Sequence, residues 1–209
     1  MDYLKHAKGT SVQMNPSEVA QARILEISDL LPKFLGACSS QMTQVATLLT
    51  DVFRSGNKVL ICGNGGSAAD SQHFAAELVS AFSKDLKRKA LPAIALTVDT
   101  SILTAFSNDF GFEGVFARQV EAYGQAGDAL IVLTTSGSSK NCLKAVEVAR
   151  AQNLKTVAFT RTSGDIAVKV DVAIEVPSIN TQHIQECHMI GYHIISELIE
   201  TALFESGRN

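Results

Sequence analysis

Short apolar runs alternate with longer segments of helical periodicity from residue 59 onward. The runs cover residues 59–62, 92–97, 129–133, 154–159 and 170–176. Each is the length of one strand, and the segments between them carry apolar residues at helical spacing. Such an alternation with short loops is typical of a parallel sheet covered by helices. We therefore predict the α/β class, with a doubly wound, mostly parallel five-stranded sheet flanked by helices.

Residues 16–58 are predicted to form a pair of amphipathic helices. Apolar residues recur at helical spacing over 24–35 and again over 42–53, and Gly36 lies between the two stretches. We expect a break at Gly36 and a helical pair that packs between subunits. Residues 1–15 are expected to be a loose leader, which leaves 16–209 as a single domain that includes the helical pair.

Composition excludes several classes of function. The formal net charge is −3, and the densest basic run, residues 84–89, is too short for a nucleic-acid surface. No run reaches the roughly 18 apolar residues that span a bilayer, and residues 1–14 lack the apolar core of a signal peptide. We expect a cytoplasmic protein without a nucleic-acid or membrane partner, whose four scattered cysteines are reduced.

Two loops rich in glycine and hydroxyl groups follow the first and third predicted strands. The run after residue 133 is Thr-Thr-Ser-Gly-Ser-Ser, and residues 63–67 read Gly-Asn-Gly-Gly-Ser. A strand, a hydroxyl-rich turn and a helix N-terminus together present donors to an anion. Ligands of open α/β sheets bind beyond the carboxyl ends of the strands, where both loops lie. We predict a pocket for a phosphate monoester. Taken alone, residues 134–139 fit an ordinary serine-rich capped turn equally well.

Polar side chains on two predicted helices suit a metal ion. His73 and Glu77 are four residues apart, and Gln185 and His193 are eight apart, so each pair shares one helix face. Imidazole, carboxylate and amide oxygen are ligands for zinc. His188 fits the helical face as well as His193 does, and a solvated ion pair is the alternative for His73 and Glu77.

Glu77 and His193 are also a plausible acid–base pair. A carboxylate can take a proton from a carbon beside a carbonyl, while an imidazole passes one to oxygen. An aldose–ketose isomerase needs both transfers, through a cis-enediol, and a metal would stabilise the enediolate charge.

Four motifs together resemble the phosphoheptose isomerase family of the sugar-isomerase (SIS) domain group. They lie at residues 62–78, 107–112, 134–139 and 184–188, and the similarity covers nearly the whole chain. The resemblance implies an SIS fold and a homotetramer with one Zn²⁺ per subunit. It also implies conversion of the sugar phosphate sedoheptulose 7-phosphate to D-glycero-D-manno-heptose 7-phosphate. That reaction is the first step of nucleotide-activated heptose biosynthesis, which supplies lipopolysaccharide and other surface glycans.

The same resemblance implies a role for individual residues. The family's zinc ligands fall on His73, Glu77, Gln185 and His193, which selects His193 over His188, with Glu77 as base and His193 as acid. Its substrate contacts fall on Asn64, Gly65, Gly66, Ser67, Glu77, Asn108, Asp109, Thr134, Thr135, Ser136, Ser139 and Gln185. Two positions depart from the family's pattern: Ala81 stands where an arginine is frequent, and Gln182 where some members have aspartate.

Two other functions are compatible with these motifs. One is a non-catalytic SIS tetramer that binds a replication initiator, a relative that lacks the glutamate found here at position 77. The other is an isomerase of a different sugar phosphate. The presence of Glu77 favours an enzyme.

Overall fold

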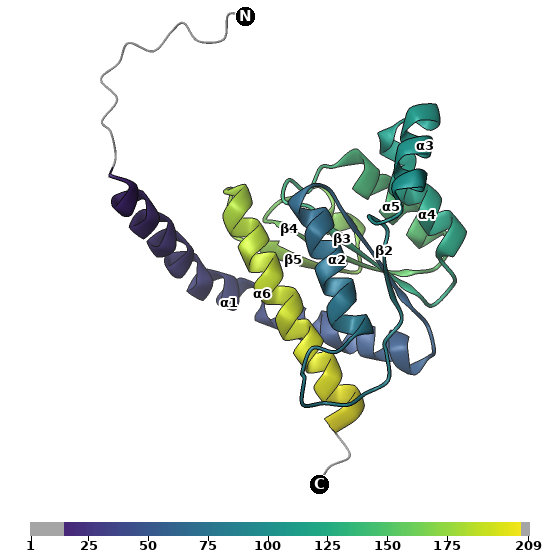
Figure 1. Ribbon diagram of the computed structural model, residues 1–209, viewed down its shortest axis with the longest axis horizontal. Coiled ribbons are helices and arrows are strands. Elements are labelled where there is room, and N and C mark those ends of the chain that lie inside the picture. The colour runs from purple at the N-terminus through teal and green to yellow at the C-terminus, as the bar shows by residue number, and fades with distance from the viewer. Residues whose placement is uncertain (1–14, 206–209) are drawn as a thin grey trace, which may run out of the picture.

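A computed structural model describes residues 15–205 of the chain, and five parallel strands form its centre (Figure 1). The strand order is β2-β1-β3-β4-β5, and every neighbouring pair is parallel. The strands are β1 (Val59–Gly63), β2 (Ala93–Ala95), β3 (Ala129–Leu133), β4 (Lys155–Arg161) and β5 (Val172–Val176). The predicted fold class and all five predicted strands are confirmed, although β2 and β5 are shorter than expected.

Residues 15–205 contain six α-helices. They are α1 (Pro16–Arg54), α2 (Gly66–Val79), α3 (Thr100–Phe110), α4 (Val115–Tyr123), α5 (Lys140–Ala151) and α6 (Thr181–Glu200). All but α3 cover the faces of the sheet. Short 3₁₀ turns occur at Phe112–Gly114 and Ala167–Lys169, and a π-helical turn, Thr201–Glu205, extends α6. Across residues 15–205, no helix has the length and apolar character needed to cross a membrane.

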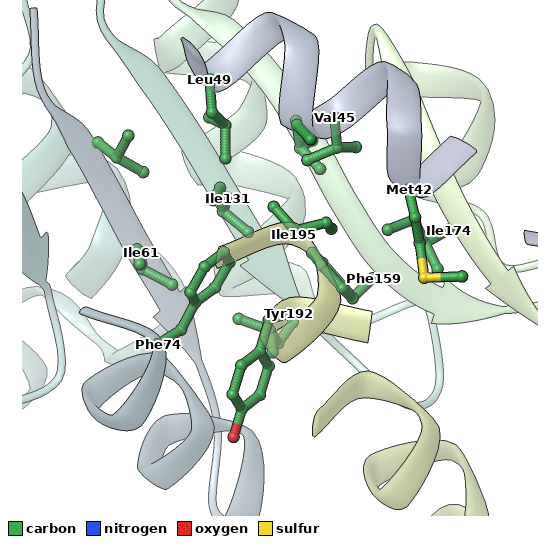
Figure 2. Packing of buried hydrophobic residues seen from close by; sticks show 14 of the residues in the cluster. Met42, Val45, Leu49, Ile61, Phe74, Ile131, Phe159, Ile174, Tyr192 and Ile195 are labelled. Atoms are coloured by element: carbon green, nitrogen blue, oxygen red, sulfur yellow. The ribbon is translucent and has the colours of Figure 1, made fainter. Parts of the chain in front are cut away.

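Successive strand residues point into two separate hydrophobic cores. Val59 and Ile61 face one core, which α1, α2 and α6 cover, while Leu60 and Cys62 face the other, which α4 and α5 cover. Figure 2 shows part of the first core, where side chains of α1, α2 and α6 meet the strands. Residues of parallel strands buried on both faces are apolar throughout, so the burial pattern explains why the strands appear in the sequence as continuous apolar runs.

The predicted break at Gly36 is wrong, because α1 runs without interruption for 39 residues. Phe34, Cys38 and Met42 continue one buried stripe through the position of the glycine. A glycine inside a helix costs about 1 kcal/mol relative to alanine, and burial of a single large apolar side chain contributes about 1.5–3 kcal/mol. The stripe therefore outweighs the glycine. The predicted leader lies outside the described residues except for Asn15, whose side chain caps α1 by accepting from the Ser17 amide.

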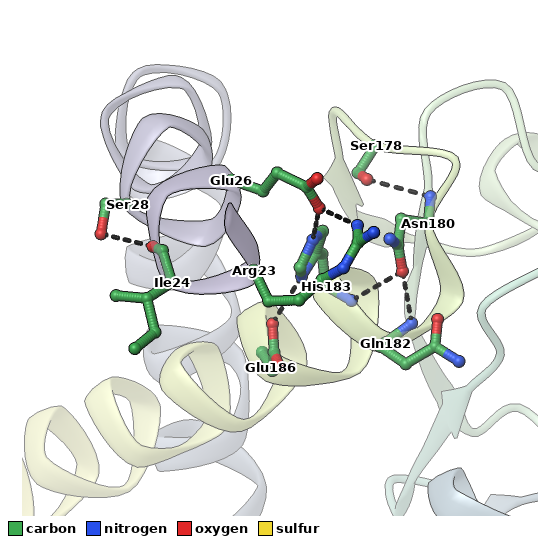
Figure 3. Close-up of polar contacts among 9 residues, drawn as sticks. All are labelled: Arg23, Ile24, Glu26, Ser28, Ser178, Asn180, Gln182, His183 and Glu186. Carbon is green, nitrogen blue, oxygen red and sulfur yellow. Dashed lines mark hydrogen bonds and ion pairs between the residues drawn. The ribbon is translucent and has the colours of Figure 1, made fainter. Parts of the chain in front are cut away.

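Polar contacts attach the first half of α1 to the start of α6 (Figure 3). His183 Nε2 lies 3.0 Å from Glu26 Oε2, and His183 Nδ1 lies 2.8 Å from Glu186 Oε2. Arg23 also pairs with Glu26. At the other end of α6, the buried carboxylate of Glu200 pairs with Arg88, so α6 is held by charged groups at both of its ends.

Candidate active site

The two glycine- and hydroxyl-rich loops lie side by side at the carboxyl edge of the sheet. Gly63 pairs with Leu133 in the strand register, so both loops leave the sheet at the same level. The side-chain amides of Asn64 and Asn141 exchange two hydrogen bonds of 2.9 Å across the gap. A cavity of about 260 Å³ opens there, lined by Asn64, Gly66, Ser67, Leu133, Thr134, Thr135, Ser139, Thr181 and Gln185.

Hydroxyl groups gather in the turn between β3 and α5. Thr134 Oγ1 accepts a hydrogen bond from the Gly137 amide at 3.3 Å and lies 3.3 Å from Ser139 Oγ and 3.5 Å from Ser136 Oγ. Gly137 has a φ of 73°, and a Cβ there would lie 2.4 Å from the Gly164 backbone. The turn therefore requires glycine. Hydroxyls and a helix N-terminus in one cavity are a suitable environment for a phosphate group.

Three potential metal ligands converge from α2 and α6. One ligand atom from each of His73, Glu77 and His193 lies within 4.8 Å of the others, and all three side chains are partly exposed. The His73 and His193 rings meet edge to face at a centroid distance of 5.0 Å, and His73 Nε2 lies 3.0 Å from Glu77 Oε1. Two imidazoles and a carboxylate at such separations fit a divalent ion such as zinc.

The charges around the cluster favour a neutral His193. Burial lowers the pKa of His193, and the neighbouring His73 lowers it further, while Glu77 opposes these effects. A neutral imidazole has the lone pair that a metal ligand needs. The electrostatics of the site are thus consistent with the donor set.

Gln185 lies in the cavity rather than on the open face of α6. A Cβ added at Gly66 would lie only 2.2 Å from Gln185 Nε2, so the amide packs directly on the glycine backbone. Gln185 lies two helical turns before His193 on α6 and therefore connects the cavity with the three-residue cluster.

The other two histidines of α6 lie away from the cluster. His188 is fully buried and packs edge-on against Phe159, with a ring centroid distance of 5.7 Å. Burial lowers the pKa of His188 to about 4. His183 contacts Glu26 and Glu186 instead. The helical face alone could not separate His188 from His193, because the distinction depends on how α6 is rotated against the sheet.

Five of the predicted contact residues do not line the cavity, and one of them, Glu77, belongs to the three-residue cluster instead. Asn108 and Asp109 form the exposed last turn of α3 instead and bond to each other at 2.9 Å. Gly65 and Ser136 are also exposed and lie outside the lining. Of the two departures from the family pattern, Ala81 follows the end of α2, and Gln182 is exposed in the first turn of α6.

Sequence reasoning missed four residues of the site. Thr181 lines the cavity, Asn141 connects the two loops, and Tyr192 and Asp70 support His73. Asp70 precedes His73 by three residues on α2 and Tyr192 precedes His193, so helical spacing alone could have found Asp70. Nothing in the sequence indicates that the Tyr192 hydroxyl reaches another helix.

Comparisons with known proteins show which family the chain is similar to. The sequence profile of the SIS domain matches residues 24–161. A phosphoheptose isomerase of Akkermansia muciniphila is 48% identical over 90% of this chain and 98% of its own length. One of Aquifex aeolicus is 47% identical over 86% of this chain and 94% of its own length. A solved phosphoheptose isomerase structure from Neisseria gonorrhoeae has a TM-score of 0.85 and 38% identity, over 90% of this chain and all of that one. One from Francisella tularensis has a TM-score of 0.86 and 35% identity over the same shares.

Proposed function

The chain belongs to the phosphoheptose isomerase family of SIS-domain proteins, and from this premise we propose that it converts sedoheptulose 7-phosphate to D-glycero-D-manno-heptose 7-phosphate. The similarity of its sequence and structure to phosphoheptose isomerases supports the assignment of the chain as a sugar-phosphate isomerase. The heptose as substrate, Zn²⁺ as cofactor and a role at the start of nucleotide-activated heptose biosynthesis are parts of the proposal.

One observation carries the proposal: the same two helices supply both halves of the site. Gly66 and Gln185 line the hydroxyl-rich cavity, while His73, Glu77 and His193 lie further along α2 and α6. At 1.5 Å per residue, seven residues separate Gly66 from His73 by about 10 Å. In the substrate the phosphate is on C7, whereas C1 and C2 react. A two-part site therefore matches a sugar phosphate that reacts at the end opposite its phosphate.

Binding begins with the phosphate in the proposed mechanism. The hydroxyls of Thr134, Thr135 and Ser139 and the amides at the N-terminus of α5 would donate hydrogen bonds to its oxygens without a cation in the turn. The Gln185 amide would contact the middle of the sugar. Anchoring of one end directs C1 and C2 toward Glu77 and His193, which reduces the entropic cost of the reaction.

Proton transfer is assigned to Glu77 and His193. Glu77 takes a proton from C1 of the ketose, His193 supplies one to the oxygen on C2, and a cis-enediol results. Return of a proton to C2 and loss of the proton on O1 give the aldose. Zn²⁺ held by His73, Glu77, Gln185 and His193 would polarise the carbonyl and stabilise the enediolate charge. Glu77 has two carboxylate oxygens, and only Oε1 lies beside His73, so the second oxygen is available for the proton.

The first test replaces the proposed base. Glu77→Gln keeps the size of the side chain and an oxygen ligand but removes the basic carboxylate, so kcat is expected to fall at least about 100-fold. The measurement is formation of aldose from a panel of ketose phosphates, with far-UV circular dichroism to check folding. Glu147→Gln, at an exposed carboxylate of α5, is the matched control and keeps full activity. Full activity of the Glu77 variant would exclude the mechanism. Absence of turnover in the wild type with every ketose phosphate would instead favour a non-catalytic SIS protein.

A further inference from the structure

The hydroxyl group of Tyr192, on α6, contacts the ring nitrogen of His73 that does not face Glu77. Tyr192 Oη lies 2.9 Å from His73 Nδ1, while His73 Nε2 faces Glu77 at 3.0 Å. The Tyr192 hydroxyl also donates to Asp70 Oδ1 at 3.5 Å. We propose that Asp70 and Tyr192 are positioning residues that fix the tautomer and the ring orientation of His73 for metal binding. The inference rests on the proposed function, because it assigns a role toward the proposed zinc site.

The donor inventory of the three groups determines the tautomer. An ionised carboxylate only accepts hydrogen bonds, so the Tyr192 proton is directed to Asp70. The tyrosine oxygen then has only lone pairs to offer His73, and His73 must donate from Nδ1–H. A ring that donates from Nδ1–H would present the lone pair of Nε2, the nitrogen that faces Glu77, to a bound zinc ion. Without a metal, the 3.0 Å contact between Nε2 and the Glu77 carboxylate needs a proton on Nε2, because a carboxylate only accepts, so the assigned tautomer is that of the zinc-bound state.

Packing holds the tyrosine in this position. Tyr192 is fully buried, and its ring stacks on Phe74 at a centroid distance of 5.1 Å and an interplanar angle of 16°. The ring also meets His193 edge to face at 4.9 Å. Figure 2 shows the Tyr192 hydroxyl pointing away from the apolar side chains around the ring. Because His193 is the next residue, one turn of α6 supplies both a ligand and the support for the ligand on α2.

A buried tyrosine hydroxyl also needs a partner for structural reasons alone, so the test must separate the two roles. Outer partners of metal-bound histidine typically change metal affinity 10–100-fold. Tyr192→Phe removes only the hydroxyl and keeps the stacked ring. Ser196→Ala is the matched control, because Ser196 is buried on the same helix and its hydroxyl donates to the backbone oxygen of Tyr192.

The experiment measures Zn²⁺ affinity of the metal-free full chain by competition with a chromophoric chelator, together with the urea midpoint of each metal-free variant. Tyr192→Phe is expected to weaken zinc binding at least 10-fold, and Ser196→Ala less than 2-fold at a comparable loss of stability. Asp70→Asn is expected to weaken binding in the wild type but not further in Tyr192→Phe, since both act through one chain of hydrogen bonds.

A second measurement needs no variant at position 192. Nitrogen-15 NMR of the zinc-loaded wild type, with His73 assigned by His73→Gln, is expected to show a proton on Nδ1 of His73 and none on Nε2. A proton on Nε2 rather than on Nδ1 in the zinc-loaded protein, or zinc affinity in Tyr192→Phe within 2-fold of a zinc-binding wild type, overturns the inference and leaves the proposed function intact. A wild type that binds no zinc overturns both the inference and the metal part of the proposed function. A wild type that binds zinc but turns over no ketose phosphate overturns the proposed isomerase activity and leaves the inference intact.

Discussion

The absence of a β-carbon at Gly66 allows the Gln185 side chain to pack against the start of α2. Gly66 opens α2 directly beneath the Gln185 amide, where an added Cβ would lie 2.2 Å from Nε2. Gly66→Ala is expected to displace Gln185 and raise KM for the sugar phosphate at least 10-fold, with little change in the fold. Steady-state kinetics on a ketose phosphate would measure this.

Gly36→Ala is the matched control for that change. Gly36 is also helical, and nothing lies within 4 Å of an added Cβ. Alanine there is expected to leave KM unchanged and to stabilise the chain by about 0.5–1 kcal/mol, because glycine is the poorer helix former. An unchanged KM in Gly66→Ala would show that Gln185 takes no part in binding.

Single residues also show what the sequence could and could not predict about the site. The spacing of His73 and Glu77 places them on one helix face, and the structure brings both to His193. The choice between His193 and His188 needed the family resemblance, because helical periodicity fits both. The contact between Tyr192 and His73 joins residues 119 positions apart, and no local pattern encodes it.

The ion pair of Arg88 and Glu200 links the end of α2 to the end of α6. The Arg88 guanidinium donates to the backbone oxygens of Glu77 and Leu78, and its Nε pairs with Glu200 at 2.5 Å. Both side chains are nearly fully buried, at 1% and 5% exposure. Removal of one partner would leave a buried charge without compensation, which typically costs about 3–5 kcal/mol.

Arg88→Met is therefore expected to lower the free energy of unfolding by several kcal/mol, as measured by urea denaturation. Arg118→Met removes one partner of an exposed pair with Glu121 and is expected to change stability by less than about 0.5 kcal/mol. Equal stability of the two variants would contradict the role given to burial.

The contact between α1 and α6 is expected to depend on pH through His183. Hydrogen bonds to Glu26 and then Glu186 raise the pKa of His183 above its usual value of 6.5. A group whose pKa is raised on folding contributes its full stabilisation below the unfolded pKa and loses it as pH rises through the folded pKa. The free energy of unfolding of the wild type should thus decrease between pH 6 and pH 9 by more than that of His183→Gln. Urea denaturation of both proteins at a series of pH values measures this difference. Parallel pH profiles of the two proteins would exclude His183 as the cause.

The bounds of an element could be predicted from the sequence where its local apolar pattern matches its burial in the structure. The strand Ala129–Leu133 was predicted with its observed bounds, because its residues are apolar and buried on both faces. The error at Gly36 is a helical position predicted as a break. Gly36 lies within a longer apolar stripe of α1, and tertiary packing outweighs its low helix propensity.

The whole molecule has an apolar surface that the single chain does not cover. The first half of α1 extends away from the sheet (Figure 1). Ile24, Leu25 and Leu35 on this helix are 64%, 63% and 62% exposed. Large apolar side chains gathered on one element favour contact with another chain. We therefore expect α1 to pack between the subunits of the proposed homotetramer.

Light scattering during size-exclusion chromatography tests this arrangement. The wild type is expected to have the mass of four 22.3 kDa chains, whereas Ile24→Glu combined with Leu35→Glu is expected to form smaller species. Each substituted side chain is exposed in the single chain, so the fold of the subunit should remain. Val168→Glu, at a residue that is 90% exposed on a turn far from α1 in sequence, is the control and should keep the wild-type mass. A double variant with an unchanged mass would place the subunit interface elsewhere, and the long helix would then need another reason to keep its apolar residues in contact with water.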